Sequence, residues 1–113
     1  NTMGLFSNSE TTSKKNSIIH DIEIINKAFR DISVLIDSRG MNNSTINSIN
    51  SVLNSVEANI TRMSSTVQSM TDSELTGFYV PWVDGRSLGI MTWIASFGTF
   101  MNKLTEEMES FIR

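Results

Sequence analysis

Apolar side chains recur at intervals of three and four residues in three separate segments of this 113-residue chain. Because an α-helix has about 3.6 residues per turn, this alternation puts the side chains on one stripe of a helix. The sequence therefore predicts an all-α fold with three amphipathic helices, over residues of about 17–38, 44–71 and 87–112. The first and third stripes consist of Ile18, Ile22, Ile25, Phe29, Ile32 and Ile36, and of Ile90, Ile94, Phe97, Met101, Leu104, Met108 and Phe111.

The second stripe is the longest and most regular of the three. An apolar alternation sustained over more than three heptads is typical of a seam between packed helices. We expect this stripe to be the main packing and oligomer interface of the protein. It is made of Ile46, Ile49, Leu53, Val56, Ile60, Met63, Val67 and Met70.

The apolar repeat changes phase between the first two stripes, across residues 39–46. Either the chain turns back at Gly40-Met41-Asn42-Asn43 as a helical hairpin, or one long helix continues through a shift in coiled-coil phase. Gly and Asn form helices poorly and turns readily, which favours the hairpin. The continuous helix stays open as the alternative.

Other signals divide the chain into segments. Residues 1–15 lack periodicity and are rich in Ser, Thr and Asn, which predicts a flexible N-terminal arm. Residues 16–113 are expected to form a single helical packing domain, either a helical bundle or a coiled-coil hairpin. Within this domain residues 72–86 are expected to be a packed connection, because apolar residues surround the only proline. The pair Asp84-Gly85 predicts a turn at its end.

Composition and motifs argue against a chemical function. A net charge of -3 offers no basic field to a nucleic acid. With no Cys and with His20 as the only histidine, no metal site is expected. Asp21 and Glu23, near His20, are expected to lie on a solvated acidic face and not in a catalytic cleft. We therefore expect a protein that is not an enzyme and binds no cofactor or small-molecule substrate.

The outer face of the second helix is unusually poor in charge. Glu57 and Arg62 are the only charged residues between Gly40 and Met70. Solvent-facing coiled coils normally carry Glu and Lys beside the seam. Two explanations stay open: this neutral face is a second contact surface in a crowded assembly, or it reflects a Ser/Asn-rich composition without a role.

Aromatic residues broaden the apolar face of the third helix, residues 87–112. Trp93, Phe97 and Phe100 are expected to pack in the core, and the alternative is an edge that contacts a partner or a membrane. The apolar stretch over residues 88–101 is shorter than the roughly 20 residues needed to span a bilayer. The acidic C-terminal part of this helix would repel anionic lipids, which favours core packing.

Two stretches resemble known families. Residues 29–40, with the sequence FRDISVLIDSRG, resemble the centre of a syntaxin-type SNARE motif, with Arg39 where that family has its central Gln. Residues 77–101, with the sequence GFYVPWVDGRSLGIMTWIASFGTFM, follow Ser/Asn-rich heptads and resemble the fibrous neck proteins of tailed phages, whose coiled coil ends in a small trimerising hairpin. The unbroken heptad from Ile90 to Phe111 argues against such a hairpin here.

These features predict a non-enzymatic structural or assembly protein that packs through heptad helix faces, against sister copies or within a larger protein assembly. The phage resemblance and the neutral composition extend this prediction to a minor component of a virus or phage particle, and so to the virion as its location. The alternative is a membrane-active or SNARE-like helical protein acting in membrane fusion or penetration.

Overall fold

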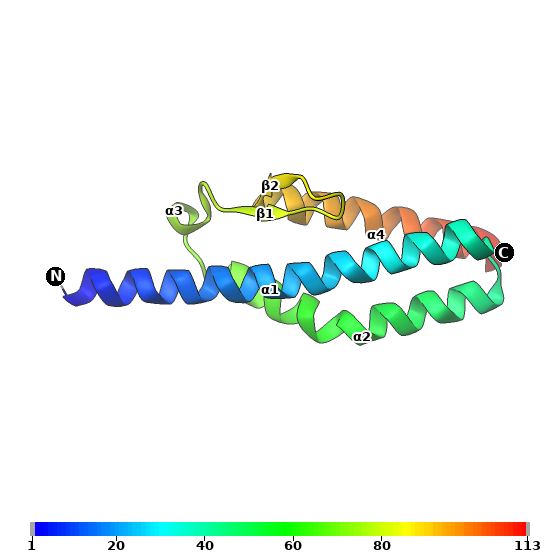
Figure 1. The fold of residues 1–113 in the computed structure, drawn as a ribbon, viewed down its shortest axis with the longest axis horizontal. Helices are drawn as coiled ribbons and strands as arrows, with labels where there is room; N and C mark the ends of the chain where they lie inside the picture. The colour runs from blue at the N-terminus through cyan, green and yellow to red at the C-terminus, as the bar shows by residue number, and fades with distance from the viewer. Residues whose placement is uncertain (1, 113) are drawn as a thin grey trace.

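The computed structural model describes residues 2–112, with side chains described from residue 9 onward. In chain order the elements are α1 (Thr2–Arg39), α2 (Asn43–Gln68), α3 (Asp72–Leu75), β1 (Tyr79–Pro81), β2 (Ser87–Gly89) and α4 (Ile90–Ile112). Figure 1 shows an elongated molecule in which α1 lies between α2 on one side and α4 with the two short strands on the other. The predicted all-α fold, with three long helices, is confirmed.

The turn between α1 and α2 is the helical hairpin that the sequence favoured. Gly40 has a φ of 70°, a left-handed conformation that glycine adopts without strain. Its backbone N–H still donates to the carbonyl oxygen of Ile36 at 2.8 Å. Asn42 then caps α2, because its Oδ1 accepts a hydrogen bond from the backbone N–H of Thr45 at 2.9 Å. The continuous long helix is therefore not the observed arrangement.

The core is built around the apolar stripe of α1. Ile18, Ile22, Ile25 and Ile32 are fully buried, and Phe29 is almost so. Side chains from α2, the β-hairpin and α4 pack on this stripe and form one continuous apolar cluster with it. Helix α1 is thus the central element on which the rest of the chain is assembled.

The N-terminal segment is part of α1. Helix α1 begins at Thr2, so residues 2–15, predicted to be a flexible arm, are helical. Once the buried stripe has nucleated a helix, adding one more residue to that helix costs little free energy, because each added residue gains a backbone hydrogen bond. Contacts from the chain beyond α2 also hold this segment: Thr11 Oγ1 donates to the carboxylate of Glu74, and Lys14 Nζ donates to the carbonyl oxygen of Ser69 at 3.4 Å.

The predicted packed connection, residues 72–86, contains a short capped helix and most of a β-hairpin. Thr71 and Glu74 form a capping box at the start of α3. Strands β1 and β2 then pair antiparallel, with Val80 opposite Leu88. The turn between them uses Gly85 at a φ of 90°, which agrees with the predicted Asp84-Gly85 turn.

Two expectations about this region are wrong. The third helix begins at Ile90 and not at residue 87, because residues 87–89 form β2. The heptad from Ile90 to Phe111 argued against a small trimerising hairpin, yet a two-stranded β-hairpin is present directly before it. The backbone N–H of Ile90 donates to the carbonyl oxygen of Phe78 at 2.9 Å, so the strand leads straight into the first turn of α4.

Candidate interaction surface

The predicted interface stripe of α2 packs inside the chain. Leu53 and Ile60 are partly buried against the core. The other six members are buried: Ile46, Ile49, Val56, Met63, Val67 and Met70. In this conformation the stripe is the seam between α2 and the rest of the chain. Its role as a contact between copies stays a prediction, and any docking on the folded chain has to use another surface.

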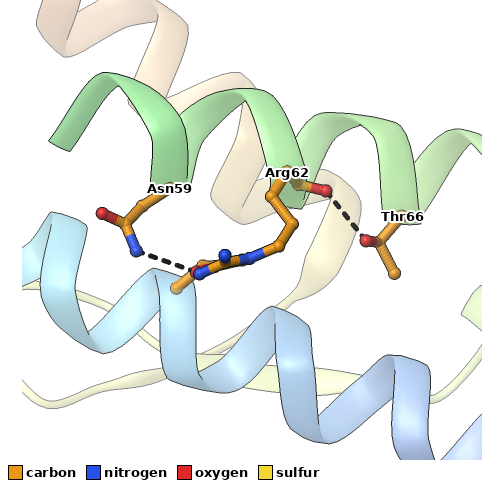
Figure 2. Close-up of polar contacts among 4 residues, drawn as sticks. Asn59, Arg62 and Thr66 are labelled. Atoms are coloured by element: carbon orange, nitrogen blue, oxygen red, sulfur yellow. Dashed lines mark hydrogen bonds and ion pairs between the residues drawn. The ribbon is translucent and has the colours of Figure 1, made fainter.

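A buried carboxylate joins α1 to α2. Asp21 is fully buried, so its expected place on a solvated acidic face is wrong, whereas His20 beside it is exposed as expected. Figure 2 shows Asn59 and Arg62 extending from α2 toward α1. Asn59 Nδ2 donates to Asp21 Oδ1 at 2.9 Å, and Arg62 Nε donates to Asp21 Oδ2 at 3.0 Å. One of the two charges on the α2 coat therefore has a structural partner.

Burial and hydrogen bonding shift the pKa of the Asp21 carboxyl in opposite directions. Burial alone would raise the pKa of Asp21. The hydrogen bonds from Arg62 and Asn59, together with the positive charge of Arg62, outweigh this effect and hold the pKa below its usual value. Asp21 therefore stays ionised at neutral pH and ties α1 to α2 in one register.

The aromatic residues of α4 form a stacked seam with α1. The ring of Phe29 stacks on Phe97 with centroids 5.3 Å apart and on Phe100 at 4.3 Å. Trp93 stacks on Phe97 at 5.4 Å and meets Trp82 edge-on at 5.9 Å. Trp93 is fully buried, so in this structure it cannot serve as an exposed membrane or partner edge. Phe97 and Phe100 are partly buried in the same seam.

Asn26 on α1 organises the junction of the β-hairpin with α4. It is 2% exposed, its Nδ2 donates to the carbonyl oxygen of Pro81 at 2.8 Å, and its Oδ1 accepts from Trp93 Nε1 at 3.3 Å. One turn further on, Arg30 Nη1 donates to the carbonyl oxygen of Val83 at 3.2 Å. These bonds seat the hairpin on α1 and bring Trp82 alongside α4.

The outer side of α4 carries an open surface that is poor in charge. No charged residue occurs from Ser87 to Asn102. A shallow groove of about 650 Å³, which we call the α4 groove, runs along this face. Met91 at one end is 57% exposed. The groove is lined by Trp82, Met91, Thr92, Ala95, Ser96, Thr99, Phe100 and Lys103.

Among the groove residues, Phe100 belongs to the possible partner or membrane edge that the sequence pattern indicated. The signal that could have revealed the others is the uncharged run of residues 87–102, in which the small residues Ala95 and Ser96 follow Thr92 and precede Thr99 at helical spacing. A face of small uncharged side chains lets another backbone approach closely.

Among the described residues, no set of three or more His, Asp and Glu side chains is placed to hold a metal ion. Within the same part of the chain, no helix is both long and apolar enough to cross a membrane. Comparisons of the chain with protein-family models, curated proteins and solved structures give no match.

Proposed function

We propose that this protein is a non-enzymatic assembly module that packs against other helices through the α4 groove. The observation that carries the proposal is the partly apolar face of α4 along this groove, within a stretch without charged residues from Ser87 to Asn102, and with Met91 more than half exposed at one end. Uncharged surfaces of this kind rimmed by charged residues mark protein contact sites. Here Lys103 lines one end of the groove.

The charged groups of the chain support a structural function over a chemical one. Three carboxyls have a lowered pKa, and each shift comes from a contact that organises the fold. Asp21 joins α1 to α2, Glu74 caps α3 and accepts from Thr11, and Asp84 accepts from Arg86 in the hairpin turn. None of these carboxyls lines the α4 groove.

The membrane alternative is less well supported by the geometry. Its central anchor, Trp93, is fully buried, and Phe97 and Phe100 stack on Phe29. The placement in a virus or phage particle stays a prediction that rests on sequence resemblance. We therefore limit the proposal to assembly through helix packing.

Sedimentation equilibrium of the full chain tests this proposal. We expect a mass that rises above 12.6 kDa as the concentration increases from about 1 μM to about 1 mM. Because an uncharged face drives the contact, association should persist when the salt is raised from about 0.1 M to about 1 M. A constant mass of 12.6 kDa over this whole range would contradict association of the chain with itself.

A further inference from the structure

We infer that the occupant of the α4 groove is a second copy of this chain, with the two α4 helices antiparallel about a two-fold axis between Ala95 and Ser96. This inference rests on the proposed function and adds the partner, the contact face and the symmetry. A two-fold contact requires a surface that is complementary to itself. The order of residues along the groove has this property.

The types of residue that line the groove follow nearly the same order in both directions along α4. From the midpoint outward on either side come a small residue, a threonine and a large apolar residue. In an antiparallel pair centred between Ala95 and Ser96, Thr92 of one copy lies level with Thr99 of its partner. Met91 of one copy likewise lies level with Phe100 of its partner. All six residues that make up this pattern line the groove: Met91, Thr92, Ala95, Ser96, Thr99 and Phe100.

Side-chain size favours close approach at the centre and filling at the ends. Ala95 and Thr99 are exposed on the free chain and project little from the helix, so the backbones of two copies can approach each other there. Met91, 57% exposed, is the projecting side chain of the same patch, and its thioether adapts to irregular apolar surfaces. In a two-fold contact the same patch of both copies is used, so a projecting side chain of one copy can fill the groove of the other.

Charge selects the antiparallel arrangement. Glu106, Glu107 and Glu109 are all exposed near the end of α4. A parallel pair would bring the two acidic ends together. In the antiparallel pair the two Glu106 residues are about 30 Å apart at about 1.5 Å per residue, well beyond a Debye length of about 8 Å.

A matched pair of arginine substitutions tests the contact face. Ala95 and Ala58 are both exposed helical alanines, on α4 and α2 respectively. Ala95→Arg puts a long cation at the centre of the proposed contact, and we expect the dimer dissociation constant in sedimentation equilibrium to rise at least about tenfold. Ala58→Arg adds the same charge elsewhere and should leave it unchanged. Circular dichroism should be the same for both variants. If Ala95→Arg associates as tightly as the unmodified chain, the assigned face is wrong.

Disulfide formation tests the symmetry, and the chain has no cysteine of its own to interfere. Thr92→Cys and Thr99→Cys chains, carrying tags of different mass, are mixed and oxidised. The antiparallel pair brings residue 92 of one copy level with residue 99 of the other. It separates the two copies of residue 92 by about 10 Å along the axis, beyond the span of a disulfide. We expect the mixed 92–99 product to exceed the 92–92 product at least about tenfold.

The outcomes separate this inference from the proposed function. A predominance of 92–92 and 99–99 products would overturn the antiparallel pair. Association that is insensitive to Ala95→Arg would overturn the α4 contact while leaving an assembly function in place. A chain that stays at 12.6 kDa at every concentration would overturn both.

Discussion

Arg62 on α2 donates through Nε to the carboxylate of Asp21 on α1 at 3.0 Å, and the two side chains differ sharply in exposure: 54% for Arg62 and 0% for Asp21. The carboxylate is shielded from solvent, whereas the guanidinium remains accessible to it. A buried charge is tolerated only when it is paired and hydrogen-bonded, and here Arg62 Nη2 and Asn59 Nδ2 both donate to Asp21 Oδ1 as well. The pair therefore links the two helices at one register, and its two partners are not equivalent.

Asp21→Ala should destabilise the fold by about 2 kcal/mol, because the partly buried amide of Asn59 loses a charged acceptor and a small cavity is left. Arg62→Met should be more harmful than Asp21→Asn, since it leaves a carboxylate buried with a single donor. Urea unfolding at neutral pH measures both effects. Glu57→Gln, on the same charge-poor coat of α2, is the control and should change stability by less than about 0.5 kcal/mol. Equal loss in Arg62→Met and Glu57→Gln would refute the role given to the pair.

Stability should fall in acid, and the lowered pKa of Asp21 gives the direction. A carboxyl whose folded pKa lies below its unfolded pKa contributes stability above the unfolded value, about 3.9 for Asp. That contribution is lost as the pH falls through the folded pKa. Urea midpoints measured between about pH 2 and pH 6 should therefore decline, and less steeply in Asp21→Asn. An identical decline in both proteins would show that Asp21 does not contribute.

The hairpin should depend on Asn26, whose side chain joins Pro81 and Trp93. Asn26→Leu keeps the volume similar but removes both hydrogen bonds, and we expect a loss of about 2 kcal/mol. The tryptophan emission spectrum should shift as well, because the indole N–H of Trp93 loses its acceptor. Asn50→Leu, at an exposed position of α2, is the control. An unchanged spectrum in Asn26→Leu would contradict the proposed organisation of this junction.

The long helices could be predicted because their evidence is spread over many residues. The stripe that begins at Ile18 repeats through several turns, and a period close to 3.6 stands out over that length. Strands β1 and β2 contain three residues each, which is too short for an alternation to be seen. Leu88 and Ile90 also fit a helical stripe as well as a strand. The three residues before α4 were therefore assigned to the helix.

The candidate surface was harder to predict for a different physical reason. The first half of α4 is uncharged around its whole circumference, so no polar side identifies the face that meets solvent. Trp93 and Thr92 are neighbours in sequence, yet one is fully buried and the other lines the groove. Asp21 and Arg62 are likewise 41 residues apart, and only the helical hairpin brings them together.

The turn at Gly40 should control whether α1 and α2 fold back or form one helix. Gly40 has a φ of 70°, which is strained for alanine, and Asn42 supplies the N-cap of α2. The double variant Gly40→Ala/Asn42→Ala removes both features, and each should cost the hairpin about 1 kcal/mol while favouring a continuous helix. A continuous helix can no longer bury the apolar stripes of α1 and α2 against each other. A second copy can supply the missing half of the α1–α2 contact, so we expect domain-swapped dimers.

Light scattering after size-exclusion chromatography distinguishes these dimers from the α4 contact. A swapped dimer uses the α1–α2 seam, so it should persist when Ala95→Arg is added to the double variant, whereas a dimer through the α4 groove should dissociate. Asn43→Ala, at an exposed position one residue beyond the cap, is the control and should leave the hairpin closed. If the double variant keeps the size and stability of the unmodified chain, the left-handed glycine and the cap do not determine the fold-back.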